Sequence, residues 1–476
     1  MQRQQKDSVL LVYPPITKLE RYSSAIGSSG GHQIPLGIFY LASYLHSNSF
    51  RTDVLDAEAM NLSYEQVIEH LRSGRFGVLG ISTTTVAFHR AAELAWKVKA
   101  ALPDTIIVVG GPHPSCQPDC LTGFDMFDFA VRNEGEQTLI ELLRAINGGA
   151  NFEGIGGLAF RKDGRVVVNE KRSYIEDIDA LPFPAYDLIR NFKCYRPPPS
   201  NYKKSPVANI TTSRGCPNQC TFCDNNVFGR QTRMRSAENI VAEIELLTNR
   251  YGVREIAFVD DTFTVRPRRI YEIFDLARTK GLRFPWTCMA RINTVDEELL
   301  SFMKRNGCWH ISFGIESGDE NILRQIRKNI RIEDVERIVA VCHSLGIRTK
   351  GFFIVGHPLE TLETIEKTIS FATRLKLDDV VVTLNTPLPG SYQYDHVSEY
   401  GTLDNKDWAK FNYWNPVFVP KGLTADILLE KHRSFYRRFY LRPRILWRYF
   451  CSFLSPTGPK RLITLLLSTP FLLKRR

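Results

Sequence analysis

Three cysteines in one short segment are the residues of this chain best suited to chemistry. Cys216, Cys220 and Cys223 lie in the segment TTSRGCPNQCTFCDNN, with the spacing CxxxCxxC. Three thiolates can bind three irons of a [4Fe–4S] cluster and leave the fourth iron open to a substrate or cosubstrate. The spacing therefore predicts a metal site at these three cysteines that holds a [4Fe–4S] cluster.

Two other uses of these cysteines fit the sequence less well. A structural zinc site needs four ligands, usually as two CxxC pairs, and no fourth cysteine or histidine lies close by in the sequence. A disulfide is disfavoured because the ten cysteines are scattered and the polar N-terminus MQRQQKDS does not resemble a secretory signal. The cluster is the favoured interpretation.

The region from residue 206 to about 390 repeats a strand-like segment followed by a helix-like segment six times. The strand-like segments lie at 207–215, 255–261, 285–291, 309–317, 348–358 and 379–390. Six such units predict a partial, open-sided (β/α)6 barrel, in which chemistry takes place at the carboxyl ends of the strands. Polar or small residues end four of the strands: Asp260, Arg291, Glu316 with Ser317, and Gly356.

The N-terminal part also alternates strand-like and helix-like segments. Its five strands are expected at 8–15, 51–58, 77–85, 105–114 and 127–136. They are continuous apolar runs, as expected when helices cover both faces of a parallel sheet. This pattern predicts a doubly wound, Rossmann-like domain whose ligands bind at the carboxyl ends of the strands.

Small residues follow the third and fourth of these strands, where a ligand would bind. They are Ser82, Thr83, Gly110 and Gly111. Glycine there lets a bulky planar or nucleotide-tailed ligand approach the backbone. The glycine fingerprint GxGxxG of dinucleotide-binding domains is absent after the first strand.

The sequence divides into four parts on this basis. Residues 1–150 form the Rossmann-like domain, and residues 151–205 form a linker with a hairpin turned at Asp163–Gly164 and Pro-rich spacers. Residues 206–392 form the barrel. Residues 393–476 form a helical C-terminal extension that is basic and aromatic.

The positive charge of the chain is concentrated at its C-terminus. The net charge is +11, and residues 431–476 contain twelve Lys or Arg and no Asp or Glu. Large apolar residues accompany these cations, which fits an anionic membrane surface better than nucleic acid. An equally favoured alternative is a helical cap on the barrel with a solvated basic face. The longest largely apolar run, 462–473, is shorter than the roughly twenty residues of a spanning helix.

The cysteine motif, with Phe222 directly before Cys223, resembles that of the radical S-adenosylmethionine (SAM) superfamily. The resemblance implies that Glu316 and Ser317 contact the SAM ribose and methionine and that Gly356 lies along the adenine. It implies more weakly that Arg327 or Lys328 contacts the SAM carboxylate. The usual glycine-glycine-glutamate after the second strand is replaced here by Val259-Asp260-Asp261, so Asp260 is the expected stand-in for binding the SAM amino group.

The N-terminal part resembles the cobalamin-binding domain attached to many radical SAM enzymes. The resemblance lies in GlyGlyProHisPro at 110–114 and GluGlyGlu at 134–136, and it implies that Ser82, Thr83, Gly110 and Gly111 bind cobalamin. The family's Asp-x-His-x-x-Gly loop has no counterpart, because Asp56-Ala57-Glu58 lacks the histidine that binds cobalt. His113 and His32 are the nearest alternatives, and neither is expected to be a ligand.

Together these resemblances imply a cobalamin-dependent radical SAM enzyme. It is expected to methylate an unactivated carbon through a 5′-deoxyadenosyl radical and methylcobalamin, with no protein side chain named as catalytic. The alternative is a non-methylating oxidation, cyclisation or rearrangement of a hydrophobic or tetrapyrrole-like substrate. A non-catalytic cobalamin or redox sensor is disfavoured, since no output domain is visible.

Partners and location follow from the same reasoning. We expect a small-molecule or lipid-like substrate and an external electron donor such as flavodoxin or ferredoxin. No nucleic-acid partner is expected. The expected location is the cytoplasm, with peripheral contact to the inner face of the membrane through the C-terminal tail as a further expectation.

Overall fold

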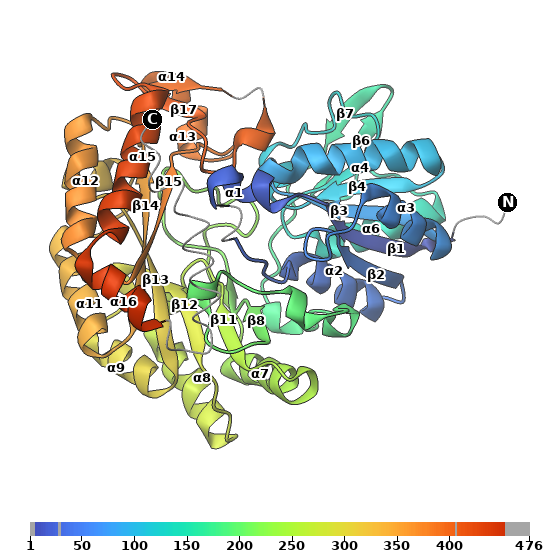
Figure 1. Ribbon diagram of the computed structural model, residues 1–476. Helices are drawn as coiled ribbons and strands as arrows, with labels where there is room; N and C mark the ends of the chain where they lie inside the picture. The colour runs from blue at the N-terminus through green and yellow to red at the C-terminus, as the bar shows by residue number, and fades with distance from the viewer. Residues whose placement is uncertain (1–4, 27–29, 405–406, 453–476) are drawn as a thin grey trace. The chain divides into compact units, whose positions relative to one another are not determined.

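The computed structural model describes residues 5–26, 30–404 and 407–452, which are drawn as ribbons in Figure 1. The chain divides into two compact units. Unit 1 comprises residues 1–17, 34–194 and 224–233, and unit 2 comprises residues 18–33, 195–223 and 234–476. Each unit is built on its own sheet.

Unit 1 contains a seven-stranded sheet with the order β2-β1-β3-β4-β5-β6-β7. Its first five strands are parallel to one another. They are β1 (Gln5–Tyr13), β2 (Arg51–Asp56), β3 (Phe76–Ser82), β4 (Ile106–Gly110) and β5 (Phe129–Val131). The apolar side chains of β1 and β3 are almost fully buried, because a doubly wound sheet has no solvent-facing side. The predicted Rossmann-like fold is confirmed.

The helices of unit 1 connect its parallel strands. α2 (Leu36–Ser47) packs against α6 (Gly135–Gly148), and α3 (Tyr64–Ser73) packs against α4 (Phe88–Ala101). The chain crosses over in opposite directions after β1 and after β2, so right-handed crossovers place α2 and α3 on opposite faces of the sheet. α3 begins with a capping box. The Ser63 hydroxyl accepts from the N–H of Gln66, and the Gln66 side chain accepts from the N–H of Ser63.

The hairpin expected in the linker is part of this sheet. β6 (Leu158–Lys162) and β7 (Arg165–Val168) join at Asp163–Gly164, and both turn residues have positive φ, 49° and 75°. This is the geometry of the tight turns that asparagine or aspartate followed by glycine favours. β6 pairs antiparallel with β5, so the hairpin extends the sheet of unit 1.

Residues 224–233, directly after the third cysteine of the motif, belong to unit 1. A buried ion pair fixes their end: Arg233 Nη1 lies 2.8 Å from Glu134 Oε2, with both side chains less than 7% exposed. Their start is held by Cys116, whose thiol donates to Asp224 at 2.7 Å. Tyr174 donates to the carbonyl of Asn226 between these points. The segment is therefore anchored to unit 1 along its length.

Unit 2 contains a six-stranded, all-parallel sheet with the order β15-β14-β13-β12-β11-β8. The strands are β8 (Val207–Ile210), β11 (Glu255–Phe258), β12 (Trp286–Ala290), β13 (Cys308–Glu316), β14 (Arg348–Val355) and β15 (Asp379–Leu384). Each lies inside the range expected from the sequence or within one residue of it. The order is sequential, as in an incomplete β/α barrel.

Helices connect these strands, and Figure 1 shows α7, α8, α9, α11 and α12 on the outside of the sheet. They are α7 (Ala237–Tyr251), α8 (Pro267–Thr279), α9 (Glu297–Arg305), α10 (Glu320–Gln325), α11 (Ile332–Ser344) and α12 (Leu362–Arg374). Trp286 is fully buried against Phe258, Phe263 and Phe274. Its indole N–H donates to the carbonyl of Asn306 at 2.7 Å, so this aromatic belongs to the core.

The last strand of the barrel, β15, has an edge that no further strand of the described residues covers. α15 (Ala425–Tyr440) packs beside it (Figure 1). Val382 N–H donates to the Tyr436 hydroxyl at 2.9 Å, and that hydroxyl donates to the Val382 carbonyl at 3.1 Å. His432 Nε2 lies 2.9 Å from the same carbonyl. Side chains of a helix thus satisfy backbone groups that a seventh strand would have paired.

The first cations of the basic tail also bind the barrel. Lys431 and Arg438 lie 2.9 Å and 2.6 Å from the carboxylate of Glu366 on α12. Arg444, on α16 (Pro443–Ser452), lies 3.6 Å from Asp378. The cap interpretation is therefore confirmed for the tail up to Arg444, whereas the apolar run 462–473 lies outside the described residues. Within the described part of the chain, no helix combines the length and apolar character needed to cross a membrane.

We predict that Tyr436→Phe loosens the edge of the barrel. The change leaves the buried N–H of Val382 without an acceptor, at a cost of about 1–3 kcal/mol. Hydrogen–deuterium exchange should then be faster at Val382 and its neighbours in β15. Tyr271→Phe is the control, because it removes a hydroxyl from the surface of α8. Unchanged exchange in β15 would show that α15 does not protect this edge through Tyr436.

Candidate functional site

The three cysteines lie on the loop that follows β8. Cys220 is buried, Cys216 is half-buried and Cys223 is exposed. The amide of Asn218 donates to Cys216 Sγ at 3.2 Å, and the backbone N–H of Cys223 donates to the carbonyl of Cys220 at 3.1 Å. The loop is the predicted position for a cofactor in a β/α barrel, at the carboxyl end of the first strand.

Asp260, at the end of β11, fixes the start of this loop. Its Oδ1 accepts from the N–H and the hydroxyl of Thr212 at 3.0 and 2.9 Å and from the hydroxyl of Ser213. Arg269 donates to the carbonyl and the hydroxyl of Thr212 at 2.7 and 2.8 Å. Asp260 Oδ2 is buried and has no hydrogen-bond partner among the described residues. Burial raises the pKa of Asp260, and Arg269 opposes that effect.

Thr221, between the second and third cysteines, fixes the middle of the loop. Its N–H donates to the carbonyl of Ile326 at 3.0 Å. Its carbonyl accepts from the N–H of Gln393 at 3.0 Å, and its hydroxyl accepts from the Gln393 amide at 3.1 Å. Asn385, just after β15, donates to the Gln393 side-chain oxygen at 3.0 Å. The loop is therefore bound to the end of the last strand, through Asn385 and Gln393, as well as to the end of the second, through Asp260.

Two cations face the buried cysteine. Arg291, at the end of β12, donates to Cys220 Sγ at 3.4 Å and also to the carbonyl of Lys328. The hydrogen bond from Cys223, together with the positive charges of Lys328 and Arg291, lowers the pKa of the Cys220 thiol below its ordinary value, even though burial acts in the opposite direction. A lowered pKa favours the thiolate, which is the form that binds iron.

Glu316, the last residue of β13, forms a buried ion pair with Lys328. Lys328 Nζ lies 2.7 Å from Glu316 Oε1, and both side chains are less than 9% exposed. The backbone of Glu316 has φ of +69°, a conformation that side-chain-bearing residues seldom adopt and that is often found at functional sites. A Cβ on Gly314 would lie 2.5 Å from Glu316 Oε1 and 2.7 Å from Lys328 Nζ, so this glycine makes room for the pair.

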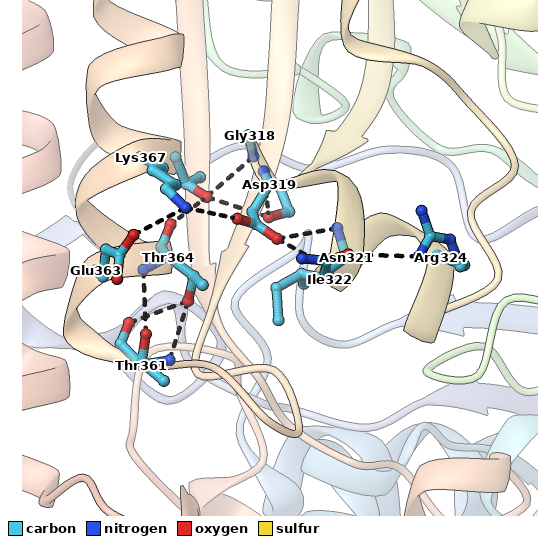
Figure 2. Close-up of polar contacts among 11 residues, drawn as sticks. Gly318, Asp319, Asn321, Ile322, Arg324, Thr361, Glu363, Thr364 and Lys367 are labelled. Carbon is cyan, nitrogen blue, oxygen red and sulfur yellow. Dashed lines mark hydrogen bonds and ion pairs between the residues drawn. The ribbon is translucent and has the colours of Figure 1, made fainter.

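The segment after Glu316 is held by hydrogen bonds to α12, as Figure 2 shows in part. The Ser317 hydroxyl, fully buried, lies 3.1 Å from the Thr368 hydroxyl and accepts from Asp319 N–H at 3.2 Å. Gly318 N–H donates to Thr368 at 2.9 Å. Asp319 caps α10 and lies 3.5 Å from Lys367. These bonds fix the direction in which Glu316 leaves the strand, and they occupy the Ser317 side chain.

The end of β14 contains a second buried carboxyl group. Gly356 has φ of +90°, and its N–H donates to Glu360 Oε2 at 2.6 Å. The N–H of His357 donates to the same oxygen at 3.0 Å. Burial raises the pKa of Glu360 to about 8. Burial and the charge of Lys328 lower the pKa of His357 to about 3, and its ring lies 5.8 Å from that of Phe222 in the cysteine loop.

The small residues predicted to bind cobalamin lie together at the carboxyl ends of β3 and β4. Thr83 N–H donates to the carbonyl of Gly110 at 2.9 Å. A Cβ on Gly111, which has φ of +97°, would lie 2.9 Å from the carbonyl oxygen and 3.0 Å from the nitrogen of Thr83. The packing of these two loops therefore already requires glycine at 111. Gly110 is different, because a Cβ there would have its nearest contact 3.5 Å away, at the carbonyl of Val131.

The histidine nearest to these loops serves the fold. His113 is buried, its Nδ1 lies 3.2 Å from the Thr85 hydroxyl, and its ring packs 4.1 Å from Phe88. Burial lowers its pKa to about 4. His32 belongs to unit 2, where its N–H donates to the carbonyl of Arg196. That neither histidine is a cobalt ligand stays a prediction.

In unit 2 the fold brings together the cysteine loop, Arg291, Glu316, Lys328 and the end of β14. Arg327 points elsewhere: it is exposed, and its guanidinium lies 4.9 Å from the ring of Tyr392. Of the two cations proposed for the SAM carboxylate, only Lys328 faces the cysteines. Thr221 and Gln393 were missed by the sequence reasoning, because nothing local distinguishes them from solvated loop residues.

The donor set suits a cluster better than a single ion. Among the described residues, no three His, Cys, Asp or Glu side chains converge closely enough to hold one metal ion. A [4Fe–4S] cube has no such requirement, since each cysteine binds a different corner. Three thiols beside two cations therefore fit the cluster that the spacing predicts.

Comparisons with known proteins agree with this site. Residues 210–372 match the Radical SAM superfamily, and residues 22–143 match the B12 binding domain. The chain is 33% identical to an uncharacterized methyltransferase of Pyrococcus horikoshii over 442 residues, which cover 92% of this chain and 93% of that protein. The chain belongs to the cobalamin-dependent radical SAM enzymes.

Two further likenesses cover most of the chain. An anaerobic magnesium-protoporphyrin IX monomethyl ester cyclase of Rubrivivax gelatinosus is 29% identical over 92% of this chain and 78% of that protein. The solved structure of the cobalamin-dependent radical SAM enzyme OxsB has a TM-score of 0.76 at 16% identity, and the match covers 97% of this chain and 71% of that one. As a member of this family, the chain is an enzyme that uses a [4Fe–4S] cluster, SAM and cobalamin.

We predict that anaerobically purified protein carries about four irons and four sulfides, as a [4Fe–4S] cube requires. Replacing Cys216, Cys220 and Cys223 together with alanine should remove this iron and abolish the formation of 5′-deoxyadenosine from SAM. Cys194→Ala, at the end of the short 3-10 helix Phe192–Cys194, should keep both. Iron and sulfide analysis and liquid chromatography check these results. A triple variant that still released 5′-deoxyadenosine would contradict the assignment of the cluster.

Proposed function

We propose that this enzyme methylates an unactivated carbon atom of a hydrophobic small molecule. The observation that carries the proposal is the 33% identity, along nearly the whole of both chains, to a protein named as a methyltransferase. When bound, the cluster and SAM supply a radical that removes hydrogen, and cobalamin supplies a carrier for the methyl group. The task of the protein is to bind and orient these groups.

Residues of unit 2 are proposed to bind SAM beside the cluster. Lys328, already facing the cysteines, is the candidate for the SAM carboxylate, and Glu316 is the candidate for the ribose. The partnerless Oδ2 of Asp260 is the candidate acceptor for the amino group. Gly356 and the backbone of Ser317 are proposed to line the nucleoside, since the Ser317 hydroxyl is already bonded. No side chain is assigned as a proton donor or acceptor.

Residues of unit 1 are proposed to bind cobalamin. Ser82, Thr83, Gly110 and Gly111 lie at the carboxyl ends of β3 and β4, where doubly wound sheets bind ligands. A Cβ at Gly110 would fit without a clash, whereas a Cβ at Gly111 would clash with Thr83. Gly110 is therefore the position at which cobalamin binding can be blocked with the least effect on the fold.

A second outcome is supported by relatives that are named as cyclases. The cyclase from Rubrivivax gelatinosus is 29% identical to this chain, and its name describes ring closure on a tetrapyrrole ester. The same cofactors would then serve an oxidation or cyclisation with no methyl transfer. The fate of the SAM methyl group separates the two proposals.

We predict that cells producing the enzyme and fed methionine with a CD3 group make a lipid or pigment that contains an intact CD3 group. Cells with the gene deleted should lack this product in mass spectra of lipid and pigment extracts. Gly110→Val should lower the cobalamin content of the purified protein by at least about tenfold, roughly 1.4 kcal/mol in binding, and abolish labelling. It should leave the iron content unchanged.

Gly148→Val is the matched control. A Cβ there meets no atom within 4 Å, so cobalamin content and labelling should stay at the wild-type values. An altered metabolite that carries no label would favour the cyclisation alternative. Normal cobalamin content in Gly110→Val would show that the cobalamin pocket lies elsewhere.

We also infer peripheral contact with an anionic membrane through the C-terminal tail. Leu446 and Trp447 on α16 are exposed, at 45% and 67%, beside the cations of the tail. The sequence that follows adds six further Lys or Arg and no acidic residue. Cations near an anionic surface contribute about 1 kcal/mol each. Such contact would suit an enzyme whose substrate is lipid-like.

We predict that the full-length enzyme cosediments with anionic vesicles, that neutral vesicles retain little of it, and that salt weakens the association. Deleting 455–476 should reduce binding and leave the iron content intact, because the contacts of α15 with the barrel remain. Equal binding to both vesicle types would contradict the role of charge. Insoluble protein after the deletion would mean that this segment belongs to the folded core.

A further inference from the structure

The parallel strands of the barrel all start at one end, opposite the cysteine loop. Each strand is preceded by the last turn of a helix or, for β8, by the end of the linker. We call the residues at this end, up to the first residue of each strand, the barrel floor: 202–207, 250–255, 278–286, 304–308, 343–348 and 374–379. The floor contains twelve Lys or Arg and three Asp or Glu.

The three acidic residues of the floor are bound inside the protein. Glu255 is buried, and its carboxylate accepts from three N–H groups. Asp379 lies 2.8 Å from the buried Lys350. Asp378 accepts from a backbone N–H and lies 3.6 Å from Arg444. These carboxylates leave most of the positive charge of the floor unbalanced.

Three further carboxylates, on neighbouring helix turns, bind cations of the floor. The pairs are Lys280 with Glu245, Arg278 with Asp275 and Arg374 with Glu336, at 2.8, 3.0 and 3.0 Å. Six other exposed cations of the floor make no ion pair with any residue that the structure describes: Lys204, Arg250, Arg254, Arg283, Arg305 and Lys376. The floor therefore keeps an excess of positive charge after these pairs are counted.

Cations also crowd one another near the start of β13. Lys203 Nζ lies 4.8 Å from the ring of Trp309, and the guanidinium of Arg348 lies 5.9 Å from the same ring. Burial and the positive charges of Lys304 and Arg348 lower the pKa of Lys203. Like charges held this close repel one another, and an anion beside them relieves that repulsion. The floor is thus suited to a negatively charged partner.

The C-terminal helix adds exposed apolar side chains at the same end of the barrel. Arg444 donates to the carbonyl of Lys376 at 3.3 Å and lies 3.6 Å from Asp378, so α16 begins against the floor. Leu446 and Trp447 of this helix are exposed. Leucine and tryptophan beside cations suit the interface of a membrane, whereas the phosphates of a nucleic acid would leave these apolar side chains in water.

We propose that the barrel floor and α16 together form a surface that binds the phosphate headgroups of an anionic lipid membrane. The cysteine loop, at the opposite end of the strands, then faces away from the membrane. This inference rests on the proposed membrane contact of the tail and adds a second contact, on the folded barrel. It does not depend on the reaction that the enzyme catalyses.

The test uses the full-length enzyme and vesicles of phosphatidylcholine with or without phosphatidylglycerol. Arg254→Glu/Arg283→Glu reverses two exposed charges that precede the neighbouring strands β11 and β12. The concentration of anionic lipid that binds half of the enzyme should rise about tenfold or more, because these cations would face the headgroups. Added salt should shrink the difference from wild type. An iron content equal to that of wild type shows that the variant is folded.

The control is Arg266→Glu/Arg324→Glu, which makes the same change of charge after β11 and β13, at the cysteine end of the barrel. Its binding should stay within about twofold of wild type, since these residues would face away from the bilayer. Equal binding of the test variant and wild type would overturn the proposal. So would an equal loss in test and control, because net charge alone would then explain the binding.

Acetylation of lysines separates the floor from the tail. Anionic vesicles should slow the acetylation of Lys204 and Lys376, while Lys421, exposed in the turn before α15, keeps its rate. If the enzyme binds vesicles and both floor lysines keep the rates of the free enzyme, the contact of the tail stands and this inference fails. If the enzyme binds no anionic vesicles, both fail. Protection of these lysines by RNA and not by vesicles would assign the floor to a different partner and overturn the inference.

Discussion

Three cysteines on one short loop must lose their protons to bind a cluster, and cations at this end of the barrel can compensate the negative charge that results. Arg291 donates to the sulfur of Cys220, and Lys328 adds a second positive charge nearby. An unpaired cation would itself be costly in this buried place, and Glu316 balances Lys328 at 2.7 Å. Glu316 reaches that position through a left-handed backbone, next to a glycine whose missing Cβ leaves room for the pair. The cations beside the cysteine loop are thus linked, through the Lys328–Glu316 ion pair, to the left-handed backbone at the end of β13.

The same loop must also be held in place, and side chains that follow the second and the last strands of the barrel do this. Asp260 binds Thr212 and Ser213 before the first cysteine, and Gln393 binds Thr221 between the second and the third. Asp260 follows the second strand of the barrel and Gln393 follows the last. A loop fixed at two points by residues so far apart in sequence can keep its sulfurs in place when its ligands change. Polar residues at the strand ends, such as Asp260 and Gln393, can therefore serve to hold the cysteine loop without contacting a substrate.

Much of the fold follows from local sequence, and the site follows only in part. Apolar runs such as 9–12 and 107–109 identify parallel buried strands, and CxxxCxxC identifies the cluster loop, because in both cases neighbouring residues carry the signal. Gln393 could not be identified in this way, since its partners lie 172 residues before it and 8 residues before it, in segments without a pattern. Gly111 was assigned to ligand approach, whereas the structure gives it a packing role against Thr83 that depends on two loops meeting. The hairpin was predicted correctly, but its pairing with β5 depends on a free sheet edge that the sequence does not display.

The ten residues after Cys223 belong to unit 1, although the residues before and after them in the sequence belong to unit 2. Glu134 is buried, and its negative charge is balanced by Arg233. A fragment that ends before residue 224 would therefore leave the carboxylate of Glu134 buried without its cation. Removing one partner of a buried ion pair typically destabilises a protein by about 3–5 kcal/mol, a large part of the stability of a single domain. A cobalamin-binding half and a radical half joined in this way cannot be exchanged between proteins by simple fusion at a linker. A recombination that replaces unit 2 must keep residues 224–233 of unit 1, which lie within the sequence of unit 2. The two units are therefore expected to be inherited together.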